Sequence, residues 1–370
     1  MADGEGRRPG EVNAVKTTGI YCRAECSARP LPSNVAVISS PTAAEAAGYR
    51  PCLRCRSDRL PPVSLHEPPQ LVEAAMGQIC AGYLDRHSEV ELGLHLGVSP
   101  RHLRRLFAES IGASPLQVAR SRRAHFARCL LDDTDLSMTD IAYASGFGSI
   151  RRMNEVMRDV FRFSPTELRS KRRRPSYSAV DGGLQIQLQS ARPIGFGQIL
   201  DALAVDLVAG VEVVDEGAYR RTTLVCGHPG VVEVAADDSD LALVVTLHLP
   251  TLAGLIDEVG RCRRIARLDR SAPGKPGPWE DFEAAVKEVV RQASGPRTAE
   301  VLAALATTYG RPLDGAGRVG LTHTFPTPGS LDRLTADEVI DPLVVSRISE
   351  LTDAHPCGAA VGPSSACETP

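Results

Sequence analysis

The sequence predicts a multidomain α+β protein: a small four-cysteine metal domain, an all-α domain of two similar helical units, and an α+β domain followed by a partial helical subdomain. Three observations support this prediction. Four of the ten cysteines form two close pairs near the N-terminus, apolar residues recur at helical spacing across residues 70–172, and apolar and polar residues alternate from Leu184. A chain of 370 residues has room for two or three domains.

The distribution of charge predicts a nucleic-acid partner for the first half of the chain. Residues 1–180 hold 26 Lys+Arg against 19 Asp+Glu, a net charge of +7, whereas residues 181–370 hold 16 against 26, a net charge of −10. No apolar run is long enough to cross a membrane, so we expect no membrane partner. Cysteines spaced as metal ligands favour a reducing cytoplasm over an oxidising compartment, and a nucleic-acid partner would place the protein at the nucleoid.

The first predicted domain, residues 1–60, contains the two cysteine pairs. Cys22 and Cys26 form C-x3-C, and Cys52 and Cys55 form C-x2-C. Two such pairs are typical of short loops that close around one tetrahedral ion, and four sulfur ligands favour Zn²⁺ over cations that prefer oxygen. The spacing alone is typical of a closed structural zinc site, so a purely structural role for the ion stays open at this point.

The residues around these cysteines indicate a reactive site. The segments T-T-G-I-Y-C-R-A-E-C-S-A-R-P and A-A-G-Y-R-P-C-L-R-C-R resemble the N-terminal domain of the Ada family of alkylation-response proteins. The resemblance implies that Cys22 takes a methyl group irreversibly from a methylated DNA phosphate, with the other three cysteines as co-ligands of the zinc. Only E-V-N-A-V-K precedes the first segment, where the family usually has a helix and a strand. Either the start of the sequence is misassigned, or part of the support of the zinc site is missing.

The second predicted domain, residues 70–172, contains two helical units that share their signals. Ser99 is a predicted helix N-cap, and Leu103, Leu106 and Phe107 follow at the spacing of a helix face that is buried in a core. A degenerate copy, G-S-I-R-R-M-N-E-V-M-R-D-V-F-R-F-S-P, begins fifty positions later, so that Ser149 matches Ser99. Residues 121–131 between the copies are predicted to form a linking helix.

This pattern resembles the AraC-type DNA-binding domain, including D-I-A-Y-A-S-G-F before the second recognition helix. The resemblance implies two helix-turn-helix units, whose recognition helices enter adjacent major grooves of double-stranded DNA. Arg162 departs from the family, which usually has a glycine there as Gly112 is in the first unit, so we expect the second helix to end differently.

Candidate DNA contacts follow from these helices, although arginines on helices are also often merely solvated. The candidates for reading bases are His102, Arg105, Ile150, Arg151 and Asn154. The candidates for phosphate contacts are Arg101, Arg104, Arg152 and Arg158. Around the cysteines, the arginines that would hold the DNA backbone, or form a solvated basic face, are Arg23, Arg29, Arg50, Arg54 and Arg56.

The third predicted domain, residues 182–270, begins with the strand signal L-Q-I-Q-L-Q and continues with a helix, further strands and a second helix. Its segments E-G-A-Y-R-R-T and G-H-P-G-V-V-E-V resemble the N-terminal subdomain of AlkA-type 3-methyladenine glycosylases. Residues 277–353 resemble part of the helical subdomain that follows in that family, and residues 354–370 are predicted to be a disordered tail. Neither an L-P-G-[IV]-G turn nor its catalytic aspartate is found after Ile340, so we expect no base excision.

Together these observations predict a transcriptional regulator that responds to alkylation damage. It would repair methyl phosphotriesters by a stoichiometric, suicidal transfer of the methyl group to Cys22, and would bind promoter DNA through its helix-turn-helix units. The expected partners are double-stranded DNA, both as alkylated backbone and as promoter operator, with RNA polymerase as a further candidate. Two alternatives remain: a plain AraC-type transcription factor with a structural zinc, and an active 3-methyladenine DNA glycosylase.

Overall fold

Four β-strands build the N-terminal region of the computed structural model, which describes residues 10–59, 68–172, 183–190, 192–268, 275–313 and 320–354. The strand order is β3-β1-β2-β4, with β1 antiparallel to β2 and β3, and β2 parallel to β4. The elements are β1 (Val12–Val15), β2 (Ile20–Cys22), the short 3-10 helix η1 (Pro32–Asn34), β3 (Val35–Ile38), α1 (Pro41–Ala46), β4 (Arg50–Pro51) and η2 (Ser57–Arg59). The segment E-V-N-A-V-K thus supplies β1, one of the two inner strands of this sheet.

Eight helices form the second region, in the expected pair of units. Ser99 and Ser149 cap the two recognition helices, because each side-chain oxygen accepts a hydrogen bond from the backbone N–H three residues on. The linking helix α6 extends well beyond the predicted residues 121–131. The helices are α2 (Gln70–Cys80), α3 (Tyr83–Arg86), α4 (Glu89–His95), α5 (Pro100–Ser110), α6 (Pro115–Asp133), α7 (Met138–Ala144), α8 (Ile150–Phe161) and α9 (Pro165–Ser170).

The residue that follows the second recognition helix is Arg162. Arg162 takes the left-handed backbone conformation, with φ of 63°, in the position where Gly112 has φ of 79° after the first recognition helix. Both helices are thus followed by a left-handed residue at the equivalent position, although α8 continues one residue further, to Phe161, where α5 ends at Ser110. An arginine can adopt this conformation, but it costs roughly 1–2 kcal/mol more than it costs glycine.

A five-stranded antiparallel sheet forms the third region, with the strand order β5-β9-β8-β7-β6. The elements are β5 (Leu184–Gln189), α10 (Phe196–Ala204), β6 (Glu212–Asp215), β7 (Ala218–Val225), β8 (His228–Ala236), β9 (Ala242–His248) and α11 (Leu255–Ile265). The helical region that follows contains α12 (Asp281–Ser294), η3 (Gly295–Arg297), α13 (Thr298–Tyr309), α14 (Pro328–Leu331) and α15 (Pro342–Ala354). The predicted disordered tail lies outside the described residues, apart from Ala354, which ends α15.

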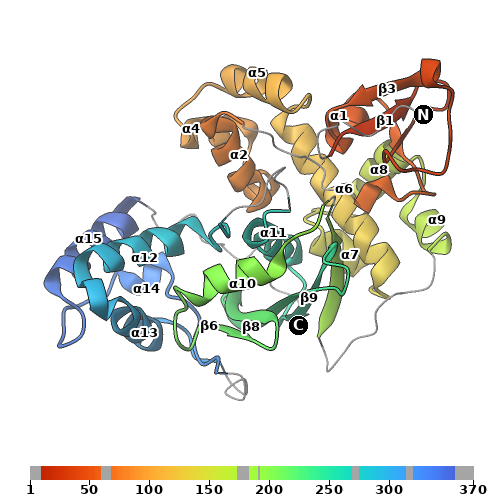
Figure 1. Ribbon diagram of the computed structural model, residues 1–370. Coiled ribbons are helices and arrows are strands. Elements are labelled where there is room, and N and C mark those ends of the chain that lie inside the picture. The colour runs from red at the N-terminus through yellow and green to blue at the C-terminus, as the bar shows by residue number, and fades with distance from the viewer. Residues whose placement is uncertain are drawn as a thin grey trace.

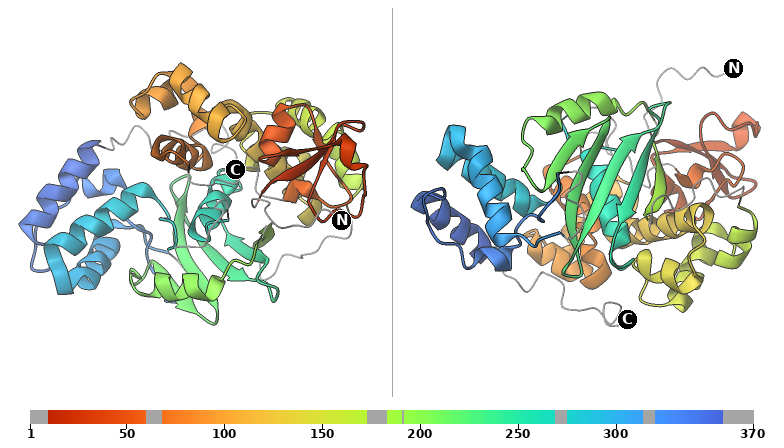
Figure 2. Two further views of the ribbon diagram at one scale, coloured as in Figure 1. Left: turned by 45° about the horizontal axis from the view of Figure 1, so that its top comes forward. Right: turned by 90° about the horizontal axis from the view of Figure 1, so that it is seen from below.

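The hydrophobic cores do not divide where the sequence suggested a boundary between the helical units and the sheet. One continuous buried cluster includes Leu130 of α6, Met157 of α8 and Val245 of β9. The C-terminal helices enclose a separate cluster around Val286 and Leu305. Figure 2 shows the sheet between the C-terminal helices on one side and the second helical unit with the N-terminal region on the other. The second helix-turn-helix unit and the sheet therefore fold around shared apolar surface.

The linking helix α6 lies at the centre of this arrangement. It packs against α1 and η2 of the N-terminal region, against helices of both units, and against strand β5. Figure 1 shows α6 running between the N-terminal sheet and the rest of the molecule. In the part of the chain that the structure describes, no helix combines the length and the apolar character that spanning a membrane requires.

Candidate metal centre and nucleic-acid interface

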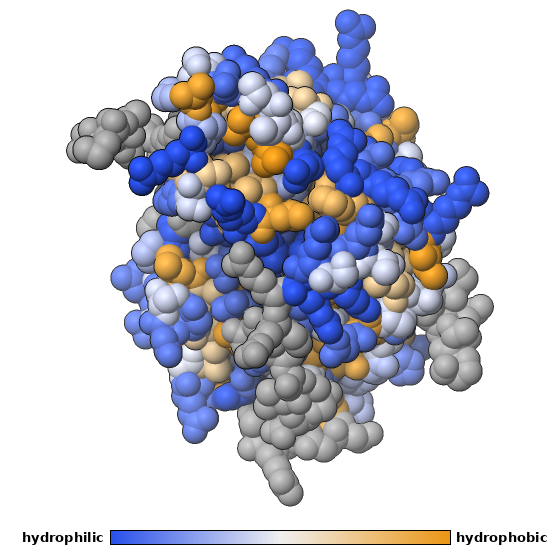
Figure 3. Space-filling view, turned by 90° about the vertical axis from the view of Figure 1, so that its right-hand side faces the viewer, coloured by the Kyte–Doolittle hydropathy of each residue, from blue (hydrophilic) through white to orange (hydrophobic). Residues whose placement is uncertain are grey.

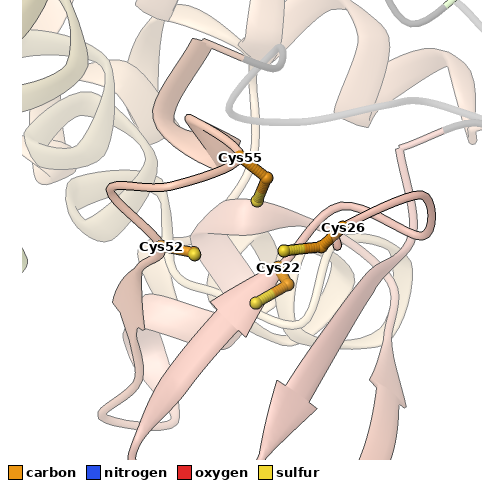
Figure 4. Close-up of side chains that lie close together, drawn as sticks. All are labelled: Cys22, Cys26, Cys52 and Cys55. Carbon is orange, nitrogen blue, oxygen red and sulfur yellow. The ribbon is translucent and has the colours of Figure 1, made fainter. Parts of the chain in front are cut away.

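Four cysteine side chains converge at one edge of the N-terminal sheet (Figure 4). Cys22 ends strand β2 and Cys26 lies in the turn that follows it, while Cys52 follows strand β4 and Cys55 precedes η2. Their Sγ atoms all lie within 4.8 Å of one another. Tetrahedral zinc with Zn–S bonds of about 2.3 Å requires sulfurs about 3.8 Å apart, so small adjustments bring these four into ligand positions. The donor set and the spacing fit Zn²⁺.

The two cysteine pairs are held together by the backbone next to them. The parallel pairing of β2 with β4 places Tyr21 beside Pro51, and the Cys52 N–H donates to the Tyr21 carbonyl over 2.9 Å. The Ser57 hydroxyl donates to that same carbonyl over 2.9 Å and accepts from the Cys52 N–H. These hydrogen bonds hold the residues that flank Cys22 and Cys52 next to each other.

The electrostatics of the cluster also favour a bound cation. The Arg23 N–H points at Cys55 Sγ over 3.4 Å, as a donor to a thiolate would. The hydrogen bond from Cys22 lowers the pKa of Cys55 to about 5, although burial opposes this shift. That same hydrogen bond, together with burial, raises the pKa of Cys22 well above its usual range. Four sulfurs this close do not all ionise unaided, whereas a cation at their centre would stabilise all four as thiolates.

The sulfurs differ in their access to solvent. Cys22, the predicted methyl acceptor, is only 5% exposed, and Cys52 is also buried, whereas Cys26 and Cys55 are partly exposed. Of the arginines in this stretch, Arg29 and Arg54 are exposed and could reach DNA. Arg56 instead forms ion pairs with Asp58 and with Asp132 of α6.

The first recognition helix, α5, exposes most of the residues that the sequence nominated. Arg101 and Arg105 are exposed and His102 is partly exposed, and Arg105 lies 3.2 Å from His102 Nδ1. Arg104 instead donates two hydrogen bonds, of 2.8 and 3.0 Å, to the buried carboxylate of Glu89 at the start of α4. Its guanidinium remains accessible, but it also joins the two helices of the unit.

The second recognition helix, α8, presents Ile150, Arg151, Arg152 and Arg158 to solvent. Arg151 and Arg152 both pair with Glu155, over 3.2 and 3.3 Å, in exposed ion pairs that are weak enough for phosphates to replace. The Asn154 amide donates to the Ile150 carbonyl in this structure, so reading a base would require that bond to be exchanged. Figure 3 shows the face of the molecule on this side, where hydrophilic side chains surround smaller apolar patches.

Sequence reasoning missed the contacts that fix the N-terminal region on α6. Arg59 pairs with Asp133 over 2.6 Å, and His125 of α6 is buried against Glu45 and Asp58. The partners lie 67 to 80 positions apart in the chain, so no local pattern reveals them. The two consecutive aspartates directly after the predicted linking helix, Asp132 and Asp133, were an available signal.

A four-cysteine metal centre packed on tandem helix-turn-helix units defines a DNA-binding protein with a metal-binding N-terminal region. Family models agree with this class. They match residues 11–58 to the metal binding domain of Ada, residues 92–171 to a helix-turn-helix domain, and residues 185–273 to the AlkA N-terminal domain. The three resemblances stated from the sequence, the fold class and the assignment of zinc are thereby confirmed.

Comparison with characterised proteins gives the family. The chain is 35% identical over 345 residues to the probable bifunctional transcriptional activator/DNA repair enzyme AlkA of Mycobacterium tuberculosis, covering 85% of this chain and 68% of that protein. It is 30% identical over 163 residues to the bifunctional enzyme Ada of Escherichia coli (42% of this chain, 43% of that protein), and 27% identical over 144 residues to AdaA of Bacillus subtilis (37% and 63%). The chain belongs to this family of bifunctional transcriptional activators and DNA repair enzymes.

Proposed function

We propose that this protein removes methyl groups from phosphotriesters in double-stranded DNA by transferring them to Cys22, and that the methylated protein then binds promoter DNA through its two recognition helices. The observation that carries the proposal is the convergence of four sulfurs in an Ada-type metal-binding region that packs directly on the helix-turn-helix domain. The family membership supports the pairing of repair with transcriptional control.

The chemistry requires only one reactive group from the chain. Bound Zn²⁺ supplies the positive charge that keeps coordinated sulfurs deprotonated at neutral pH. The Cys22 thiolate attacks the methyl carbon, a sulfur–carbon bond forms, and the bond between the methyl carbon and the phosphate ester oxygen breaks. The phosphodiester leaves as an anion with the bonding electron pair, so no proton has to move. The product is a thioether on Cys22, and because the chain offers no route back, each molecule reacts once.

The transfer changes the charge of the site, which supplies a signal. One thiolate becomes a neutral thioether, so the site repels DNA phosphates less strongly. A unit charge about 4 Å from another contributes about 1 kcal/mol in water and more near a protein surface. A tenfold change in affinity needs only about 1.4 kcal/mol. One methyl group is therefore sufficient to raise affinity for promoter DNA.

Intact mass measurement tests the proposal. The zinc-loaded protein is incubated with duplex DNA that carries methyl phosphotriesters, and we expect a gain of one methyl group, mapped by peptide analysis to Cys22. The Cys22→Ser variant should gain none, while Cys80→Ser, which removes a thiol outside the cluster, should gain as the wild type does. No gain by the wild type would instead favour a plain AraC-type regulator with a structural zinc. A methyl mapped to the more exposed Cys26 or Cys55 would refute the assignment of Cys22.

We also propose that residues 183–354 by themselves excise no damaged bases, because no L-P-G-[IV]-G turn occurs among them. The AlkA-like sheet would then serve the regulator structurally, which agrees with the core that it shares with the second helix-turn-helix unit. Free 3-methyladenine released from alkylated DNA, at a rate proportional to the concentration of this protein, would establish the competing function of an active glycosylase.

A promoter-bound activator acts through transcription, so we propose RNA polymerase as a partner and the nucleoid as the place of action. Transcription from an operator-containing template should rise when the methylated protein replaces the unmethylated protein. Equal transcript yields with both forms, at concentrations that saturate the operator, would contradict an activating role.

A further inference from the structure

One buried imidazole joins both cysteine pairs to the helix-turn-helix domain. His125 lies in the middle of α6 and is 6% exposed. Its Nε2 lies 2.5 Å from Glu45 Oε1, and the Tyr21 hydroxyl donates to that same carboxylate oxygen over 2.8 Å. Its Nδ1 donates to the Asp58 carbonyl over 2.8 Å. Tyr21 immediately precedes Cys22, and Asp58 follows Cys55 by three positions, so each ring nitrogen is connected to one cysteine pair.

The other side of the imidazole faces the second recognition helix. The ring centroids of His125 and Phe161, the last residue of α8, lie 5.9 Å apart. Strand β4 packs against α8, and the guanidinium of Arg162, the next residue, donates to the Gly48 carbonyl over 3.4 Å. A displacement of the strands that carry the cysteines would therefore reach α8 by two routes, through the ring of His125 and through β4.

Hydrogen bonds from both ring nitrogens fix the orientation of the His125 imidazole. A carbonyl oxygen can only accept, so Nδ1 carries a proton, and Nε2 faces a carboxylate that also accepts. Both nitrogens therefore donate, and the ring is held as an imidazolium between two acceptors. Charge-assisted bonds of this kind are shorter and stronger than neutral ones, and burial excludes competing water.

Methylation of Cys22 would disturb the start of this connection. Successive side chains of a strand point to opposite faces, so Cys22 faces the cluster while Tyr21 enters the small core with Val12, Ala14 and Ala44. Because Cys22 is only 5% exposed and its sulfur lies within 4.8 Å of three other sulfurs, we expect an added methyl group to displace the end of β2. Close-packed cores transmit such movements instead of absorbing them.

We propose that His125 is a positioning residue that transmits the methylation of Cys22 to recognition helix α8, so that the gain in operator affinity includes a mechanical contribution besides the change in charge. This inference rests on the proposed function. It assigns the buried connection between the metal region and α6 a role in regulation as well as in stability.

Two substitutions separate the two arms of the connection. His125→Gln can keep a donor near the Nε2 position, toward Glu45, and loses the Nδ1 bond to Asp58, whereas His125→Asn can keep the Nδ1 donor and loses the bond to Glu45. Tyr21→Phe removes a single hydroxyl from the Glu45 arm. The matched control is Thr42→Val, which removes a buried hydroxyl bonded over 3.1 Å to Ser121 of α6, in the same interface but away from His125.

The measurement is the ratio of operator affinities of the methylated and unmethylated forms of each full-length, zinc-loaded variant, with zinc content and methyl uptake determined in parallel. We expect the ratio to fall by about threefold or more in His125→Asn and Tyr21→Phe, while zinc content and methyl uptake stay at wild-type levels and Thr42→Val keeps the wild-type ratio. A merely structural contact would leave this ratio unchanged.

Three outcomes would overturn the inference. Wild-type ratios in both His125 variants and in Tyr21→Phe would show that the change in charge suffices. An equal fall of the affinity ratio in Thr42→Val would show that any loosening of this interface lowers the ratio and that His125 has no specific role. If the wild type gains a methyl group but no operator affinity, the proposed signal itself fails together with this inference, whereas a normal wild-type gain with unaffected variants refutes the inference alone.

Discussion

At the scale of single residues, backbone conformation and buried charge decide where this chain is under strain. Arg162 holds a left-handed conformation that the sequence pattern assigns to glycine, and its guanidinium makes a long, exposed hydrogen bond to the Gly48 carbonyl. Nothing in the local sequence shows that an arginine would accept this conformation. The capping and core packing of α8 impose it, because Ser149 fixes the start of the helix and Phe161 fixes its end in the core.

Replacing Arg162 with glycine should therefore stabilise the protein. We expect Arg162→Gly to raise the free energy of unfolding by about 0.5–1 kcal/mol, measured by urea denaturation. The reciprocal control is Gly112→Ala, whose new Cβ would lie 3.0 Å from the Ala43 side chain at a positive φ, and which should lower stability by about 1 kcal/mol or more. A destabilised Arg162→Gly protein would mean that the arginine side chain makes a contribution that outweighs its backbone strain.

The charge of His125 predicts a dependence of stability on pH. Burial opposes the charged ring, but the carboxylate of Glu45 and then Asp58 outweigh it and raise the pKa of His125 above its ordinary value of about 6.5. A raised folded-state pKa gives stabilisation that is complete below about pH 6.5 and is lost as the pH rises through the folded-state pKa. The difference in unfolding free energy between wild type and His125→Gln should therefore shrink as the pH rises. A difference that is constant from pH 6 to pH 9 would contradict the charged state.

At the scale of elements, local sequence signals predicted the helices and strands better than they predicted which elements pack against one another. The serines before α5, α6, α8 and α9 cap their helices, and the alternating segment from Leu184 forms β5, because caps and periodicity depend on residues close together in the chain. The four cysteines were also predicted as one cluster from spacing and resemblance. The docking of the N-terminal sheet on α6 was not predictable, since its ion pairs join residues more than 70 positions apart.

The N-terminal sheet should depend on its metal. Its own buried apolar cluster consists of Val12, Ala14, Tyr21 and Ala44, which is too small to stabilise four short strands alone. We expect chelation of the metal to increase backbone amide exchange across residues 12–58 by about tenfold or more, while α6 and α8 keep most of their protection. Hydrogen exchange with mass spectrometry measures both regions in one sample. Unchanged exchange in β1 and β2 after verified loss of the metal would show that docking on α6 is sufficient.

At the scale of the whole molecule, the sheet and the helical units are joined by polar contacts as well as by a shared core. Arg122 of α6 is largely buried and donates to the Asp257 carboxylate over 2.9 Å and to the carbonyls of Cys80 and Ile256 over 2.7 and 3.0 Å. It thereby connects α2, α6 and α11, which belong to regions that the sequence placed in separate domains. Resemblance to separate families does not predict contacts between these regions, because each family pattern covers only its own segment of the chain.

Removing this connection should destabilise the molecule as a unit. Arg122→Ala removes a buried ion-pair partner from Asp257 and one of the two arginine partners of Asp85, and we expect a loss of about 3 kcal/mol or more of unfolding free energy. Arg120→Ala, two positions away on the same helix, removes an exposed pair with Asp159 and should cost less than about 1 kcal/mol. Thermal or urea unfolding of both variants provides the comparison. Similar small losses would show that the regions fold independently.

The apolar face that β5 and β9 share with α6 and α8 has a consequence for how such proteins can evolve. If recombination replaced the residues after 183 with an unrelated enzyme, the apolar surfaces of α6 and α8 that now pack on the sheet would be exposed to solvent. The resulting chimera would be prone to aggregation. The sheet and the second helix-turn-helix unit are therefore expected to be inherited together, because each covers apolar surface of the other.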